Sequence, residues 1–326
     1  MMLLKHFHLN WEQAFKQKKL NIIEFIKKFE LEYKGDLSIE IDCISSSSNP
    51  KPNSLIYVVN EKFTPNIDSK NVVLITTPLL KDKLTFKNIL FSDNPRLAFA
   101  QITHFFNSQS KLFIKSPLFE DVTIGKNVVI EENVTLGHNV TLGHNVVLHK
   151  NTFIGNNVNI DSGTVIGSEG FGNVLDASSN WEHIYHLGSV VIGNNVMIGA
   201  NCCIDKGTID NTIIEDGVII DNSVHIAHNV RIGEKTAIAA KVGIAGSCNI
   251  GKRNMIGGMV GIVDHIKTAD DVIISATSTV NRDIKEPGTY TGIMPVVKHS
   301  KWKRIALWIM KLDKIAEILD LKRSKI

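Results

Sequence analysis

Aliphatic residues recur at every sixth position through most of this chain. The positions are Leu118, Ile124, Ile130, Leu136, Leu142, Leu148, Ile154, Ile160 and Ile166, then Ile192, Ile198 and Ile204, then Ile214, Ile220, Ile226, Ile232, Ile238, Ile244, Ile250, Ile256 and Ile262, and finally Ile274 and Val280, with Thr268 departing in type. A strand repeats every two residues and a helix every 3.6, so neither produces this register. A period of six is typical of a parallel β-helix, in which three short sides form one coil of about 18 residues.

Glycine often follows the recurring aliphatic residue, as in Ile124-Gly125 and Ile232-Gly233. Glycine and asparagine adopt positive φ at low cost, as a tight corner between two sides requires. Stacked coils should lie about 4.8 Å apart, the spacing of hydrogen-bonded strands. Each aliphatic side chain should then pack on another one coil away. We therefore expect a mainly β fold with a continuous apolar core, whose two ends need caps.

The register is interrupted twice. Residues 168–189 leave it altogether, and this segment contains Phe171, Trp181, Tyr185 and His186. A solenoid expels insertions as loops, often on its binding face, so we expect an ordered loop that covers something. The second interruption is a slip of four residues at Asp210 and Asn211.

The segments on either side of the repeat follow other patterns. The first of them predicts helices over 22–29, capped by Asn21, and over 95–106, and strands at 37–41, 55–59 and 72–76. The sequence thus predicts a small α/β domain at 1–112, a β-helix at 113–286 with the loop inserted at 168–189, and a helical extension at 287–326.

The C-terminal segment combines an apolar stripe with basic residues. Its apolar side chains at helical spacing are Trp302, Ile305, Ile309, Leu312, Ile315 and Leu319, and lysines and arginines lie beside them. Two compatible interpretations stay open: a helix that caps the solenoid end or a trimer axis, and a basic docking surface for an acidic partner.

Composition narrows the class of protein. The 326 residues are 43% hydrophobic and 21% charged, so widespread disorder is not expected. A formal net charge of +3 does not suit a general nucleic-acid binder. No apolar run is long enough for a transmembrane segment. The first residues lack a secretory pattern, so we expect a cytoplasmic protein whose four cysteines stay reduced.

One stretch of the repeat resembles a known family closely. It contains Gly170-Phe171-Gly172, Ile204-Asp205-Lys206-Gly207-Thr208, Asp221-Asn222 and Ile226-Ala227-His228-Asn229-Val230. These motifs, with the flanking segments, resemble the UDP-3-O-acylglucosamine N-acyltransferases of the lipid A pathway, within the hexapeptide-repeat acyltransferases. The resemblance implies a left-handed β-helix and a homotrimer with active sites between neighbouring solenoids. It also implies transfer of a 3-hydroxyacyl group from acyl carrier protein to the 2-amine of UDP-3-O-acyl-glucosamine.

This reaction needs few catalytic groups from the protein, because a thioester is already activated toward attack by an amine. A base must accept a proton, and a donor must stabilise the tetrahedral oxyanion. We expect no cofactor or metal, and no covalent enzyme intermediate. His228 is the candidate base: it occupies the third place of its hexad, at a corner, where its side chain should point out of the core. Histidine is also largely neutral at cytoplasmic pH.

The spacing of 18 places Gly246 one coil beyond His228, where its backbone N–H could face the same groove. The resemblance implies that Gly246 is the oxyanion donor. It also implies a supporting role in substrate binding for His265 and a place near the base for Asp221 and Asn222. Asp221 could orient the imidazole, although a corner turn explains the Asp-Asn pair equally well.

The segment 54–63 resembles the uracil-binding strand and turn of the family. Tyr57 and Phe63 take the places of two aromatic rings that sandwich the base, and Asn60 takes the place of the residue that reads its edge. The order of the two ring types is exchanged relative to the family pattern. The segment 184–187, Ile-Tyr-His-Leu, also departs from the Ile-Pro-Gln-Leu that is usual there.

Three other functions stay open at this point. The first is a divergent hexapeptide acyltransferase with another acyl donor or sugar acceptor. The second is a zinc carbonic anhydrase of the same fold, which needs three converging histidines; His225 and His228 are close in sequence. The third is a scaffold without catalytic activity.

Overall fold

A computed structural model of the protein describes residues 20–59, 72–81, 83–84, 86–109, 121–292 and 295–318. It forms two compact units, residues 1–291 and 292–326. Among the described residues, no helix has both the length and the apolar composition that crossing a lipid bilayer requires.

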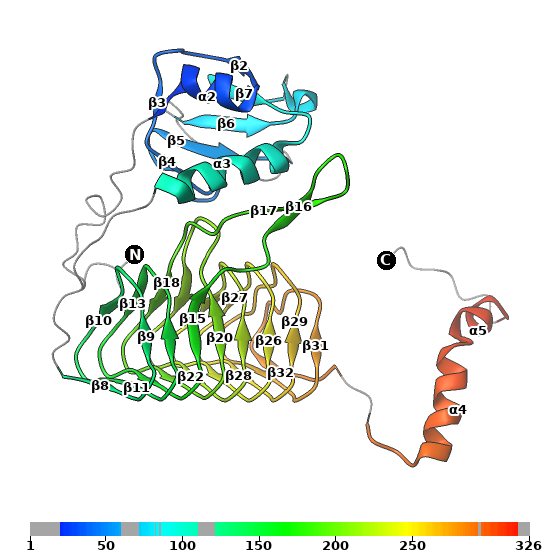
Figure 1. The fold of residues 1–326 in the computed structure, drawn as a ribbon. Helices are drawn as coiled ribbons and strands as arrows, with labels where there is room; N and C mark the ends of the chain where they lie inside the picture. The colour runs from blue at the N-terminus through cyan, green and yellow to red at the C-terminus, as the bar shows by residue number, and fades with distance from the viewer. Residues whose placement is uncertain are drawn as a thin grey trace. The chain divides into compact units, whose positions relative to one another are not determined.

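The larger unit is dominated by a parallel β-helix with three sheets (Figure 1). One sheet contains β8 (Val122–Ile124), β11 (Val140–Leu142), β14 (Asn159–Ile160), β19 (Met197–Ile198), β22 (Ile219–Ile220), β25 (Ala237–Ile238), β28 (Met255–Ile256), β30 (Val272–Ile274) and β32 (Gly288–Tyr290). The second contains β9 (Val129–Ile130), β12 (Val147–Leu148), β15 (Val165–Ser168), β20 (Cys203–Asp205), β23 (His225–Ile226), β26 (Gly243–Ile244), β29 (Gly261–Ile262) and β31 (Thr279–Val280). The third contains β10 (Thr135–Leu136), β13 (Thr152–Ile154), β18 (Val190–Ile192), β21 (Thr212–Ile214), β24 (Arg231–Ile232) and β27 (Asn249–Ile250).

The observed register follows the hexads. Equivalent residues in successive coils are 18 apart, as the Asn127–Asn145 hydrogen bond illustrates. The spacing becomes 38 across the inserted loop, between Asn157 and Asn195, and 22 across the four-residue slip, between Asn194 and Asp216. The recurring aliphatic side chains point inward, and from Leu142 to Ile274 they are at most 3% exposed. The prediction of a mainly β fold built as a parallel β-helix is therefore confirmed.

The corners need residues that tolerate positive φ. Asparagines fill many of them with φ near +55°, including Asn139, Asn157 and Asn195. Their amide groups hydrogen-bond from coil to coil, from Asn139 to Asn157 at 3.0 Å and from Asn157 to Asn195 at 3.2 Å. Asparagine thus combines a cheap left-handed conformation with a bond between coils.

The N-terminal region is an α/β domain. Its five-stranded sheet has the order β2 (Glu32–Lys34), β7 (Asn88–Phe91), β6 (Val73–Thr76), β5 (Ser54–Tyr57) and β4 (Cys43–Ile44). A separate two-stranded sheet pairs β1 (Leu20–Asn21) with β3 (Glu40–Ile41). The helices are α2 (Ile22–Phe29), a 3-10 helix (Pro78–Leu80) and α3 (Pro95–Gln109). Asn21 caps α2 as expected, because its side chain accepts a hydrogen bond from the N–H of Ile23. The strand expected at 37–41 is shorter, since only Glu40 and Ile41 pair and Leu37 is exposed.

The inserted loop is ordered, as the sequence predicts. It forms an antiparallel hairpin of β16 (Asn173–Leu175) and β17 (Trp181–His183). Val174 and Ile184 are buried in the same cluster as Phe99 of α3. The N–H of Tyr185 donates to Thr103 Oγ1 at 3.1 Å. The hairpin therefore fastens the N-terminal domain to the β-helix.

The coil continues beyond residue 286, the end expected from the sequence, because β32 pairs in parallel with β30. The second unit contains α4 (His299–Ile309) and α5 (Leu312–Ile318). The apolar stripe expected as one helix is thus divided between two, with Met310 ending the first.

Candidate active site

The candidate base His228 lies at a corner of the β-helix. It follows β23, whose Ile226 is fully buried and fixes which way the next residues turn. Lys206 lies one coil before it, since Ile204 pairs with Ile226, and Gly246 lies one coil after it, since Ile226 pairs with Ile244. The predicted alignment of residues from neighbouring coils is therefore present.

Asn229 orients the imidazole of His228. Its Oδ1 lies 3.0 Å from His228 Nδ1 and accepts a hydrogen bond from the N–H of Thr208 at 3.0 Å. Its Nδ2 donates to the carbonyl oxygen of Asp210 at 2.9 Å. A backbone N–H and a backbone carbonyl thus fix which end of the amide is oxygen. The proton of a neutral His228 belongs on Nδ1, which leaves the Nε2 lone pair free.

Gly246 lies against the reactive side of this ring. A Cβ atom at Gly246 would stand 2.9 Å from His228 Nε2 and 2.8 Å from Cε1. Among the described residues, the N–H of Gly246 has no hydrogen-bond partner. At the same place in other hexads, a side chain accepts this bond, as Asp221 Oδ2 does for Ala240 and Asp270 Oδ1 for Lys252. The absence of a side chain at Gly246 leaves room for a substrate to reach His228 Nε2, and the backbone N–H of Gly246 is left as a hydrogen-bond donor for that substrate.

Burial lowers the pKa of His228, the hydrogen bond to Asn229 opposes this shift, and the nearby His186 adds to it. The net direction is downward, so the neutral form persists to lower pH than in a solvated histidine. The rings of His186 and His228 meet edge to face, with centroids 5.1 Å apart.

The corner opens into a groove of about 840 Å³, lined by His228, Gly246 and His265 from the β-helix and by Tyr57 and Arg96 from the N-terminal domain. Tyr57 stacks on Phe99, with ring centroids 4.7 Å apart. The structure therefore brings Tyr57 and His265 to one cavity with the candidate base. Asn60 and Phe63, the other predicted uracil contacts, lie outside the described residues.

Asp221 does not contact His228. It follows β22 on a different side of the coil, where its Oδ1 accepts hydrogen bonds from the N–H and Nδ2 of Asn222. Asn222 Oδ1 in turn accepts from the N–H of Ala200 at 2.7 Å. Asp221 therefore does not orient the imidazole of its own chain, because the interval of seven residues carries the backbone past one corner, and its catalytic role stays a prediction. The alternative of a corner turn describes the pair, and Asn222 as a substrate contact stays a prediction.

Several site residues were missed from the sequence alone. Asn229 stands within the quoted motif, directly after His228, so its adjacency was the available signal. Asp205 is also in a quoted motif; it is 5% exposed and accepts a hydrogen bond from Ser168 Oγ at 2.7 Å. Arg96 gave no signal, because only the packing of two domains brings it to the groove.

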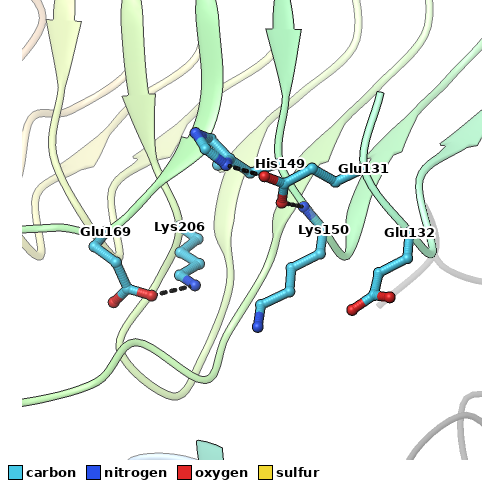
Figure 2. A pocket seen from close by; sticks show the side chains of 7 residues that line it. Glu131, Glu132, His149, Lys150, Glu169 and Lys206 are labelled. Carbon is cyan, nitrogen blue, oxygen red and sulfur yellow. Dashed lines mark hydrogen bonds and ion pairs between the residues drawn. The ribbon is translucent and has the colours of Figure 1, made fainter. Parts of the chain in front are cut away.

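A second hollow of about 520 Å³ lies toward the N-terminal end of the β-helix (Figure 2). It is lined by Glu131, Glu132, His149, Lys150, Gly167, Glu169 and Lys206. Figure 2 shows Lys206 directed at the carboxylate of Glu169, and His149 at that of Glu131, 3.0 Å away. Lys206 belongs to the same corner as His228.

Comparisons with known proteins fit this geometry. The family described as "Bacterial transferase hexapeptide (six repeats)" matches residues 118–150 and 211–246. The chain is 48% identical over 315 residues to a UDP-3-O-acylglucosamine N-acyltransferase of Vesicomyosocius okutanii, covering 90% of this chain and 94% of that protein. A protein of the same name from Ruthia magnifica is 47% identical over 326 residues, covering 93% and 98%. The chain belongs to the UDP-3-O-acylglucosamine N-acyltransferase family.

As a member of that family, the protein is an acyltransferase with hexapeptide repeats. Among solved structures, the UDP-N-acetylglucosamine acyltransferase of Francisella novicida is 22% identical, with a TM-score of 0.47, and covers 66% of this chain and 82% of its own. The carbonic anhydrase and scaffold alternatives are set aside by membership of the UDP-3-O-acylglucosamine N-acyltransferase family.

Proposed function

We propose that this acyltransferase moves a 3-hydroxyacyl group from acyl carrier protein to the 2-amine of UDP-3-O-acyl-glucosamine, with His228 as general base. The observation that carries the proposal is the pairing of His228 with Asn229, which presents a lone pair at Nε2 beside the uncapped N–H of Gly246. The name shared by two full-length relatives supports the acceptor.

In the proposed reaction the neutral amine attacks the thioester carbonyl carbon, and His228 Nε2 takes the proton that the nitrogen gives up. The carbonyl oxygen becomes an oxyanion, which the N–H of Gly246 stabilises. When the tetrahedral intermediate collapses, the C–S bond breaks and the imidazolium protonates the departing thiolate. The amide bond is formed, the histidine returns to neutral, and no cofactor is consumed.

The nucleotide occupies the end of the groove formed by the N-terminal domain. Tyr57 offers a ring for the uracil, and Asn60 and Phe63 remain predicted contacts. Arg96 adds a guanidinium group to the same cavity, which suits a diphosphate. His265, which lines the same groove, and Asn222 complete the proposed substrate contacts.

A homotrimer is part of the proposal. The nine-stranded sheet carries an apolar stripe formed by Met197, Ile219, Met255 and Ile273, each 42–56% exposed, with the half-buried Ala237 on the coil between Ile219 and Met255. Contiguous apolar surface of this kind marks protein–protein contacts. It supports association with further copies of the chain, as the resemblance implies.

The test mixes the purified full-length chain with UDP-3-O-acyl-glucosamine and 3-hydroxyacyl carrier protein, and measures the diacylated product by mass spectrometry. We expect product with the wild type and a loss of about 10²- to 10⁴-fold in turnover for His228→Ala. His138→Ala is the matched control, because His138 takes the same hexad place and is exposed. Failure of the wild type to acylate this acceptor contradicts the function, and near-normal turnover of His228→Ala contradicts the mechanism.

A further inference from the structure

We propose that Glu169, His183 and His186 form a binding site for a divalent transition metal, Zn²⁺ in the first place, at the base of the inserted loop. His186 Nδ1 lies 3.2 Å from Glu169 Oε2, and His183 Nε2 lies 3.6 Å from the same oxygen. One nitrogen or oxygen from each residue lies within 4.8 Å of the other two. Two imidazoles and a carboxylate are a common ligand set for zinc.

These separations agree with the dimensions of a zinc site. Zinc binds histidine nitrogen and carboxylate oxygen at about 2.0–2.1 Å, so two ligands of a tetrahedral ion stand about 3.3 Å apart. The two contacts to Glu169 Oε2 lie on either side of this value, and the two histidine nitrogens lie within 4.8 Å of each other. An ion between the three donors therefore requires these nitrogens to approach each other by no more than about 1.5 Å.

Neighbouring side chains hydrogen-bond to the proposed ligands and orient them, as the residues behind the ligands do in known metal sites. His183 Nδ1 lies 3.3 Å from Asn173 Oδ1, which favours a proton on Nδ1 and leaves Nε2 as the donor to a metal. Lys206 pairs with Oε1 of Glu169, while Oε2 accepts a hydrogen bond from the backbone N–H of His186 at 2.9 Å and faces the two imidazoles. The ammonium group opposes a nearby cation, so we expect a moderate affinity rather than that of a closed structural zinc site.

His186 provides the independent reason to look for a ligand. Its side chain is fully buried, yet neither of its ring nitrogens has a hydrogen-bond partner among the described residues, and Nδ1 has only the ion-pair contact with Glu169 Oε2. A buried polar group without a partner is costly and needs an explanation. Coordination through Nδ1 gives this ring a strong interaction in place of the water that burial removes, and it fixes the ring whose edge meets His228.

A metal here would join the two ends of the loop. Glu169 begins the insertion, and His183 and His186 end it, beyond the hairpin of β16 and β17. The ion would close the intervening segment and hold the hairpin against α3. The acyl transfer proposed above does not depend on it.

The test titrates the metal-free, full-length protein with Co²⁺ and records the visible absorption bands of the ion, then displaces it with Zn²⁺. We expect one Co²⁺ per chain with bands of four- or five-coordinate geometry, and a higher melting temperature with Zn²⁺. His183→Gln should weaken Co²⁺ binding by more than about 100-fold, beyond the effect of losing an outer partner. His183 is half-buried and gives the safer variant; His186→Gln should repeat the result.

Two control variants make the outcome decisive. His149→Gln removes a histidine that faces a single glutamate, Glu131, and should bind Co²⁺ like the wild type. His225→Gln tests the separate group of Cys203, Asp205 and His225, and should also bind normally. The proposal fails if the wild type shows no stoichiometric binding, if both His183→Gln and His186→Gln retain it, or if either control variant loses it.

Discussion

At the scale of single residues, the site depends on one amide group. Asn229 holds His228 Nδ1 while its own orientation is fixed by Thr208 and Asp210. An amide oxygen can accept a hydrogen bond from the N–H of a neutral imidazole without the strong stabilisation of imidazolium that a carboxylate gives. The arrangement therefore keeps the base oriented and neutral at once.

This argument predicts the pH dependence. Burial lowers the pKa of His228, so protonation inactivates the base only below the ordinary value near 6.5. The acid limb of kcat/KM should fall below that value in the wild type. Asn229→Asp should move the limb to higher pH, because a carboxylate favours the charged ring, while asparagine and aspartate both tolerate the φ of +61°. A pH profile that does not move would contradict the role given to Asn229.

Gly246 makes a second prediction at this scale. Gly246→Ala puts a methyl group within 3 Å of the His228 ring, so we expect at least a tenfold loss of kcat with little change in melting temperature. Gly258→Ala is the control, since Gly258 takes the same hexad place and its Cβ would meet only Ala240 O at 3.4 Å. Equal activity of the two variants would show that the approach to Nε2 is not used.

At the scale of elements, stability lies in the inward hexad positions. Ile250 is 1% exposed, whereas Asn249, its neighbour in β27, is exposed. Ile250→Ala should cost about 2–5 kcal/mol of unfolding free energy through lost burial and the cavity it leaves. Asn249→Ala should change it by less than about 0.5 kcal/mol. Urea denaturation of both variants measures the difference, and similar midpoints would contradict the assignment of faces.

The sequence predicted the elements that a local pattern determines. The period of six gave the β-helix, its register and both interruptions, and Asn21 gave the start of α2. Contacts across elements could not be obtained in this way. The division of the C-terminal stripe at Met310 and the meeting of the hairpin with α3 depend on packing that no periodicity records.

The same limit applies to the site. Spacing placed His228 and Gly246 in one groove, because an interval of 18 residues returns to the same corner, and the family resemblance added His265. Asp221 was suggested by the motif alone, and it lies at another corner of the same chain because an interval of seven residues passes a corner. Arg96 and Tyr57 reach the groove through a domain contact, and only the motif of Tyr57 indicated it.

At the scale of the whole molecule, the exposed stripe on the nine-stranded sheet predicts assembly. Met255→Lys places a charge in its middle, so we expect a smaller oligomer in size-exclusion chromatography with light scattering. Thr141→Lys lies on the same sheet but outside the stripe, and should assemble normally. If both variants assemble like the wild type, the stripe is not the contact between copies.

The four-residue slip constrains how this solenoid can change its length. Whole coils of 18 residues could be gained or lost elsewhere, since each one shifts its neighbours by about 4.8 Å and preserves every corner. The interval between Thr208 and Asn229 has no such freedom, because its extra residues carry the Asp210 carbonyl that fixes the amide beside the base. Deleting the four extra residues would restore the regular coil of 18 residues, but it would remove the contact that fixes the Asn229 amide and leave the His228 imidazole free to rotate.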